Sequence, residues 1–167
     1  DFEKALKLDP RDSGIFLNRA QAYINEHKYD LAAKDITKAR AIMGAKQTAQ
    51  LYVVNSQIQI ANKQTKNALE DLKEAQEKFP RNPDIILAKA DVLAASGKIS
   101  DGIIAAEKAI EMDKNDVDAI LKHGLLSIKF GNKMRAAEDF AEVIKLDPRN
   151  VVAYKTRGML YLQQEKY

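Results

Sequence analysis

The chain repeats itself at an interval of about 34 residues. The segment LDPRD at 8–12 returns as LDPRN at 146–150, and the related FPRN occupies 79–82. One series of residues keeps residue-number differences of 34, 36, 34 and 34: Ala5, Ala39, Ala75, Ala109 and Val143. An insertion of two residues near 45–48 explains the single departure. A period of this length predicts similar structural units stacked on one another.

Each period holds two stretches with helical periodicity. Phe16, Ala20, Tyr23 and Ile24 stand at positions i, i+4, i+7 and i+8, which places them on one face of a helix. A second apolar face begins after a polar break at 26–28. The second stretch of a period ends at Asp-Pro, Phe-Pro or Met-Gly. Proline ends the first two of these because it cannot continue a helix. The pattern predicts roughly ten helices of about 13–16 residues and no strands.

Composition excludes several classes of protein. The 167 residues include no cysteine, which rules out disulfides, thiolate zinc sites and cysteine nucleophiles. Hydrophobic residues make up 46% and charged residues 31%, and no apolar stretch approaches the ~18 residues of a membrane-spanning helix. The net charge of +3 is too small to indicate nucleic acid as a partner. The compartment stays open, with the cytoplasm favoured over the periplasm.

Small and aromatic residues at fixed offsets connect the period to a known family. Two antiparallel helices approach closely where the side chains are small, and Ala32 facing Ala20, or Ala136 facing Gly124, supplies such a site. On these features the chain resembles the tetratricopeptide repeats, a family of 34-residue helix-turn-helix units. The residues of one well-matched repeat are Ala136, Phe140, Val143, Pro148, Tyr154, Arg157, Gly158 and Tyr161.

The resemblance implies an all-α fold, a right-handed α-α superhelix (solenoid) of stacked helix-turn-helix hairpins. It covers residues 1–167 as a single fragment of an array. The divisions are a half repeat at 1–12, full repeats at 13–48, 49–82, 83–116 and 117–150, and a half repeat at 151–167. The second full repeat departs most from the family, with Asn55, Ser56 and Gln59 where Leu, Gly and Tyr are usual.

For function, the resemblance implies a non-catalytic scaffold for protein–protein interaction. In this family the first helix of each hairpin lines a concave groove that binds a peptide segment or a helix of a partner. The residues of this chain at the groove positions are Leu17, Asn18, Gln21, Val53, Val54, Gln57, Leu87, Asp91, Leu121, Lys122, Leu125, Lys155 and Met159. Their charge changes from neutral through acidic at Asp91 to basic at Lys122 and Lys155, so a partner segment of opposite charge order is expected.

The identity of the protein or peptide partner stays open. The subclass that grips the acidic tails of heat-shock chaperones needs Lys and Asn on one repeat, Asn on the next, and Lys and Arg on the third. No starting repeat of this chain meets that pattern, so a chaperone-tail clamp is not expected.

Enzymatic and RNA-binding functions fit the residues less well. His27 and His123 are too far apart for a His-x-x-x-His zinc pair, and neither a metal site nor a cofactor is expected. The dipeptide at 97–98 lacks the preceding glycine of a phosphate loop. The paired carboxylates at 70–71 and 138–139 are interpreted as solvated helix faces rather than acid–base dyads. RNA binding is disfavoured because the candidate reader positions differ between repeats.

The alternative function is a structural spacer or a self-association module of a larger protein. Leu160, Tyr161 and Leu162 give the last predicted helix an apolar face that is expected to be partly bare. Association through such an end would make the mass of the protein rise with its concentration. A peptide scaffold would instead lose binding when groove residues change, while its folding stays intact.

Overall fold

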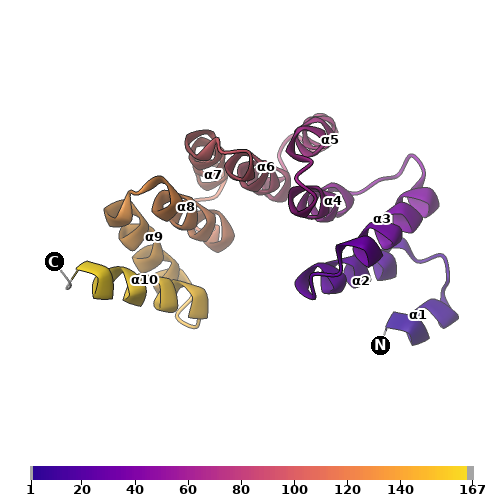
Figure 1. Ribbon diagram of the computed structural model, residues 1–167, viewed down its shortest axis with the longest axis horizontal. Coiled ribbons are helices and arrows are strands. Elements are labelled where there is room, and N and C mark those ends of the chain that lie inside the picture. The colour runs from indigo at the N-terminus through magenta and orange to yellow at the C-terminus, as the bar shows by residue number, and fades with distance from the viewer. Residues whose placement is uncertain (1, 165–167) are drawn as a thin grey trace. The chain divides into compact units, whose positions relative to one another are not determined.

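The computed structural model describes residues 2–164, and within that range it contains ten α-helices and no strand (Figure 1). The helices are α1 (Phe2–Leu8), α2 (Ser13–Asn25), α3 (Tyr29–Met43), α4 (Ala49–Ala61), α5 (Thr65–Lys78), α6 (Pro83–Ala95), α7 (Ile99–Met112), α8 (Val117–Phe130), α9 (Lys133–Leu146) and α10 (Val151–Gln164). The prediction of ten helices and no strands is confirmed for this range. Residues 1 and 165–167, which belong to the predicted half repeats, lie outside it.

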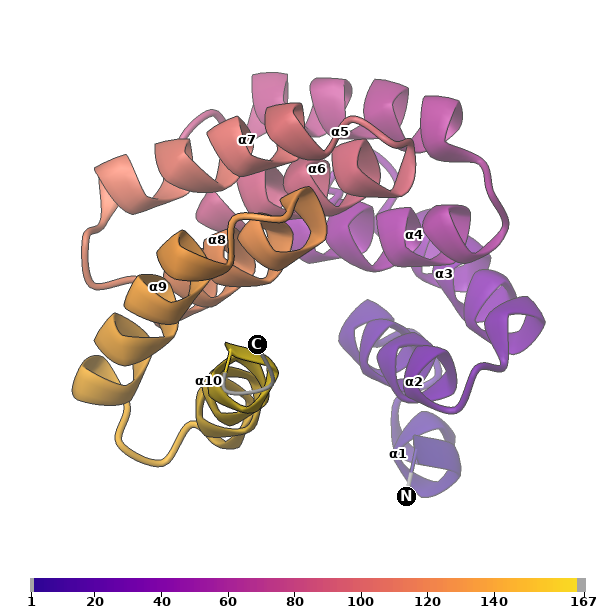
Figure 2. The same cartoon turned by 60° about the vertical axis from the view of Figure 1, so that its left-hand side comes forward.

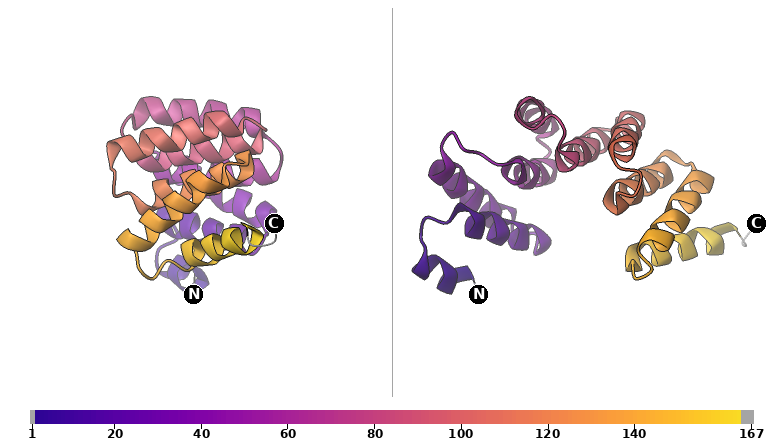
Figure 3. Two further views of the ribbon diagram at one scale, coloured as in Figure 1. Left: turned by 90° about the vertical axis from the view of Figure 1, so that its left-hand side faces the viewer. Right: turned by 180° about the vertical axis from the view of Figure 1, so that it is seen from behind.

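The helices form two compact units, an N-terminal unit of residues 1–88 and a C-terminal unit of residues 89–167. In the N-terminal unit, α2 packs on α3 and α4 packs on α5, and Figure 2 shows α4 and α5 side by side along their length. In the C-terminal unit, α8 packs on both α7 and α9, and α9 packs on α10. The short turn that joins α9 to α10 is visible between the orange and yellow helices in Figure 3. The boundaries of the individual repeats stay a prediction.

Proline and capping side chains set many of the helix boundaries. Helices α1, α5 and α9 each end one residue before the residue that precedes a proline, as the sequence predicts. Asp12 begins α2 by accepting a hydrogen bond from the backbone N–H of Gly14 at 2.7 Å. Asp116 begins α8 in the same way, with the N–H of Ala119 at 3.0 Å. These side chains satisfy backbone donors that have no partner within the helix.

Small residues let the two helices of a hairpin approach closely. Ala20 and Ala32 are fully buried in the core of the N-terminal unit, and Ala136 is fully buried in the core of the C-terminal unit. Gly124 of α8 lies so near α9 that a Cβ atom there would stand 3.0 Å from the ring of Phe140. The close approach of α8 to α9 at Gly124 agrees with the predicted small-residue packing, while the specific contacts of Ala20 with Ala32 and of Gly124 with Ala136 stay predictions.

One residue in the turn of each hairpin adopts a left-handed backbone. Gly97 and Gly131 do so with φ angles of 85° and 94°, as expected for glycines that close a helix. His27 and Lys63 stand at the equivalent positions of the two earlier hairpins, with φ angles of 59° and 58°. A residue with a Cβ atom pays about 1–2 kcal/mol for this conformation. Two of these four turns therefore hold strain that glycine would remove.

Replacing Lys63 with glycine is expected to raise the free energy of unfolding by about 1 kcal/mol, because it relieves the strained backbone. The matched control is Lys73→Gly in the middle of α5, where glycine should instead lower that free energy by about 1 kcal/mol. Urea unfolding followed by circular dichroism measures both changes. Loss of stability in both variants would contradict the strain at residue 63.

Candidate peptide-binding surface

In the N-terminal unit, the first helices α2 and α4 are joined by a row of amide side chains. The Nε2 atom of Gln21 donates a hydrogen bond to Oε1 of Gln57 at 3.0 Å, from α2 to α4. Nε2 of Gln50 donates to Oδ1 of Asn18 at 3.4 Å, and Gln21 also reaches Oδ1 of Asn25 at 3.4 Å. All five side chains are exposed or half-buried. We call these residues (18, 21, 25, 50 and 57) the amide row.

The amide row contains three of the residues selected from the sequence, namely Asn18, Gln21 and Gln57. Sequence reasoning missed Gln50 and Asn25, which lie within hydrogen-bonding distance of them. An amide carries both a donor and an acceptor, so a row of amides can meet the alternating N–H and C=O groups of a peptide backbone. The half-buried Val53 on α4 adds an apolar position to the same helix.

In the C-terminal unit, an ion pair joins the first helices α6 and α8. Nζ of Lys122 lies 2.6 Å from both carboxylate oxygens of Asp91. The predicted change from acidic to basic charge is therefore wrong at these two residues, because they neutralise each other. The sequence spacing could not show this, since the two side chains are 31 residues apart and meet only when α6 and α8 pack. Lys155 on α10 remains exposed and basic.

The apolar residues that were selected from the sequence for peptide binding differ in how far they are exposed. Leu121 and Leu125 on α8 are half-buried, and Met159 on α10 is 49% exposed. Three others were expected to line the surface but are buried side chains: Leu17 at 1% exposure, Val54 at 2% and Leu87 at 8%. Leu17 and Val54 belong to the core of the N-terminal unit, because α2 packs on α4 as well as on α3 and so buries a wider face. A bound peptide has no access to side chains buried to this extent.

Polar pairs between the two helices of a hairpin recur at a separation of 16 residues. Nε and Nη2 of Arg19 donate to the two oxygens of Asp35 at 2.6 and 2.7 Å. Nδ2 of Asn55 donates to Asp71 at 2.9 Å, in the same place between α4 and α5. Gln59 donates to that carboxylate as well, at 2.9 Å. Asn55 and Gln59, which depart from the family pattern, thus serve the local hairpin.

The third such pair joins His123 of α8 to Asp139 of α9, with 2.6 Å between Nδ1 and Oδ2. His123 is 2% exposed and Asp139 is 7% exposed. The interpretation of 138–139 as a wholly solvated face is therefore wrong for Asp139, although Glu138 is exposed. The same correction applies to Asp71, which is half-buried and hydrogen-bonded. The signal that could have found these pairs is the shared offset of 16 residues in successive repeats.

The hydrogen bond to Asp139 raises the pKa of His123 above its ordinary value of 6.5. Burial opposes this shift because it disfavours the charged imidazolium, and the nearby guanidinium of Arg135 also lowers the pKa. The charges of Asp139 and of Glu107, whose carboxylate lies 3.5 Å from Nε2, add to the increase. The protonated form of His123 is thus favoured in the folded C-terminal unit.

Raising the pH is expected to destabilise the C-terminal unit through His123. Because the folded-state pKa is raised, the pair contributes in full below the unfolded-state value of about 6.5 and loses its contribution as the pH rises through the folded-state pKa. Urea unfolding at a series of pH values above about 6 measures this loss. A His123→Gln variant should show a flatter profile than the parent. Parallel profiles for the two proteins would contradict the linkage.

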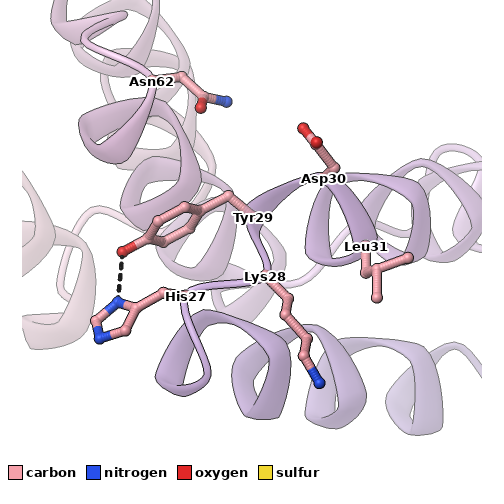
Figure 4. A pocket seen from close by; sticks show the side chains of 6 residues that line it. All are labelled: His27, Lys28, Tyr29, Asp30, Leu31 and Asn62. Atoms are coloured by element: carbon pink, nitrogen blue, oxygen red, sulfur yellow. Dashed lines mark hydrogen bonds between the residues drawn. The ribbon is translucent and has the colours of Figure 1, made fainter.

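A pocket of about 330 Å³ lies at the turn between α2 and α3, beside the end of α4. Figure 4 shows the residues that line it, with His27 and Tyr29 sharing a hydrogen bond of 3.0 Å between Nδ1 and the hydroxyl oxygen. Lys28 is paired with Glu26 at 2.6 Å. The lining includes none of the residues selected from the sequence for peptide binding, so the pocket is separate from the amide row.

Residues 2–164 lack two features that would indicate other functions. That part of the chain contains no helix long and apolar enough to cross a membrane. It also contains no group of three or more His, Cys, Asp or Glu side chains placed to hold a metal ion.

Comparison with known proteins agrees with this architecture. A thermophilic tetratricopeptide repeat protein of Thermus thermophilus superposes with a TM-score of 0.86 at 19% identity, covering 96% of this chain and 87% of that one. The repeat protein YrrB, described as having an unusual peptide-binding site, superposes with a TM-score of 0.62 at 20% identity, covering 94% and 80%. At these sequence identities, the superpositions show only that the fold is shared.

Sequence comparison points to the same family. The mitochondrial import receptor subunit TOM70 of Rattus norvegicus is 22% identical over 170 residues, which cover 98% of this chain and 28% of the receptor subunit. The chain thus spans little more than a quarter of that relative. Models of the tetratricopeptide repeat match residues 2–34 and 59–123. With these matches and the helical hairpins described above, the chain belongs to the tetratricopeptide repeat family.

Proposed function

We propose that this chain is a non-catalytic scaffold that binds a peptide segment of a partner protein on the exposed faces of its first helices. The scaffold role is supported by the family, whose fold is in general a module for protein interaction. The choice of a peptide as the ligand, and of the surface that binds it, rests chiefly on the amide row of the N-terminal unit.

The amide row suits an extended peptide backbone. Its side chains come from two adjacent helices, and each can donate and accept hydrogen bonds. None of them carries a charge, so the row favours the main chain of a partner over an acidic tail. In the C-terminal unit the Asp91–Lys122 pair is internally neutralised, while Leu121 and Leu125 offer half-buried apolar contacts. The peptide-binding site named for YrrB supports a peptide as the ligand class.

The non-catalytic part of the proposal rests on the placement of the titratable side chains. The pKa of His123 is raised by its hydrogen bond to Asp139, yet its side chain is 2% exposed and a substrate could not reach it. Its partner Asp139 is also buried, at 7% exposure. This pair is suited to holding the two helices together.

A binding experiment tests the proposal. Peptides are selected from a random display library on the 167-residue chain, and their affinity is compared with that for Gln21→Ala/Gln57→Ala. The double variant should bind about tenfold more weakly, since it removes hydrogen bonds worth ~0.5–1.5 kcal/mol each. The control, Gln64→Ala/Asn67→Ala, removes two exposed amides at the start of α5 and should bind like the parent.

Circular dichroism of both double variants must match the parent, which separates lost binding from lost folding. Equal affinity of the parent and the amide-row variant would contradict the proposed surface. Failure to select any peptide, together with a mass that doubles at high concentration in sedimentation, would favour the self-association module instead.

A further inference from the structure

The turn between α8 and α9 projects two large apolar side chains into solvent. Phe130, the last residue of α8, is 58% exposed, and Met134 in the first turn of α9 is 74% exposed. We call residues 129–135 the α8–α9 tip. Figure 1 shows this turn as the loop that joins adjacent ends of α8 and α9. Neither side chain belongs to the hydrophobic core of the C-terminal unit.

In the other hairpins, the residues equivalent to Phe130 and Met134 are exposed as well. The exposure of these two positions is therefore a feature of the hairpin and does not depend on nearness to the end of the chain. The equivalent residues in three preceding tips are all exposed and small, polar or charged: Glu26 and Asp30, Asn62 and Lys66, Ser96 and Ser100. A tip therefore needs no apolar side chain for the hairpin to form. Phe130 and Met134 stand where the other hairpins have polar residues, and packing within the repeat buries neither apolar side chain.

The α8–α9 tip is also basic. It carries Lys129, Lys133 and Arg135 and no carboxylate. Arg135 lies 3.4 Å from Glu138 and 3.8 Å from Asp139 with a side chain that is 55% exposed. Lys129 and Lys133 are exposed, and no ion pair to either is found within residues 2–164. The tip thus combines two exposed apolar groups with cations on both sides of them.

We propose that the α8–α9 tip docks the protein peripherally on an anionic lipid bilayer. Phe130 and Met134 enter the interface below the headgroups, while Lys129 and Lys133 extend their apolar stems and keep their ammonium groups at the lipid phosphates. Each cation near an anionic surface strengthens binding about fivefold. Because this contact involves one turn and two apolar side chains, the association is weak and reversible.

A bilayer fits the tip better than an acidic protein does. The tip is a projecting turn, and it has no row of donors and acceptors like the one on α2 and α4. A bilayer needs no matching shape, and it accepts flexible cations and apolar groups at the depths where each is most stable. A protein pocket would have to match both projecting side chains and pair with separate, mobile lysines.

Vesicle sedimentation tests the proposal. The chain should sediment with vesicles of equal parts phosphatidylcholine and phosphatidylserine, and it should stay in solution with phosphatidylcholine alone. The variant Phe130→Ser/Met134→Ser, which copies the serines of the preceding tip, should bind at least fivefold more weakly because it removes the two apolar groups that enter the bilayer. The control, Ile104→Ser/Met112→Ser, removes two residues of α7 that are 50% and 45% exposed and should bind like the parent. Circular dichroism verifies that both variants fold.

A tryptophan reporter distinguishes insertion from adsorption by charge. The chain has no tryptophan, so Phe130→Trp places a single reporter at the tip, and its emission should shift to the blue with the anionic vesicles. Val151→Trp, at the start of α10 and the opposite end of α9 from the tip, should show no shift.

Three results would overturn the proposal. One is equal vesicle binding by the parent and the serine variant. Another is an unshifted Phe130→Trp spectrum at a lipid concentration where the protein sediments. The last is tip-dependent binding to an acidic protein without any binding to vesicles, which would assign the tip to a protein partner instead.

Discussion

Replacing Asp139 with alanine is expected to lower the free energy of unfolding of the C-terminal unit by about 3 kcal/mol. His123 lies 2.6 Å from this carboxylate and is 2% exposed, so the substitution leaves a buried imidazole without its partner. The imidazole must then either stay charged in a poorly solvated site or lose its proton, and both cost free energy. Urea unfolding followed by circular dichroism, with amide exchange in α8, measures the effect.

The adjacent carboxylate provides the control for this prediction. Glu138 has a 62% exposed side chain and a 3.4 Å contact with Arg135, so Glu138→Ala should change stability by no more than about 0.5 kcal/mol. Replacing both members of the buried pair, as His123→Leu/Asp139→Leu, should cost less than Asp139→Ala alone, because no unpaired polar group remains. Similar losses for Asp139→Ala and Glu138→Ala would contradict the structural role of the pair.

Replacing Gly102 with alanine is expected to cost about 1–3 kcal/mol, although alanine is the better helix former. A Cβ atom at this position would stand 2.9 Å from the carbonyl oxygen of Ala90 and 3.5 Å from Cδ1 of Leu126. The first of these neighbours is backbone, which cannot move aside as a flexible side chain can. Helices α6 and α7 would have to separate within the C-terminal unit. Thermal and urea unfolding measure the loss.

Gly158 of α10 provides the matched control. A Cβ atom there would meet no atom within 4 Å, so Gly158→Ala should raise stability by up to about 1 kcal/mol through helix propensity alone. The two substitutions are chemically identical and both lie in helices of the C-terminal unit. If both variants gained stability, the close approach of α7 to α6 would not be a constraint on the fold.

The fold was predictable because its determinants are local and periodic. Ala20 and Ala32 recur at the spacing that a close helix pair needs, and each of the four prolines falls outside a helix or in its first turn. The turns were less predictable. A left-handed backbone at Gly97 follows from glycine itself, whereas Lys63 adopts it because the rest of the hairpin requires a turn there.

The candidate site was predictable in outline, and the exceptions have a common physical cause. Helical periodicity separates faces of a helix, but it does not reveal how many neighbours a face meets. Leu17 is buried because α2 packs on two helices, and Asp139 is buried while Glu138 is not, although the two are adjacent in sequence. The pairing of Lys122 with Asp91 likewise depends on the distance between side chains on separate helices.

Solution NMR tests the central claim, that the first helices bind a peptide, most directly. The isotope-labelled chain would be titrated with a peptide selected from the library described above. A peptide on the amide row should shift the side-chain amide signals of Asn18, Gln21 and Gln57, together with backbone signals of α2 and α4. Shifts confined to the second helices α3 and α5, with those three side-chain amides unmoved, would contradict it.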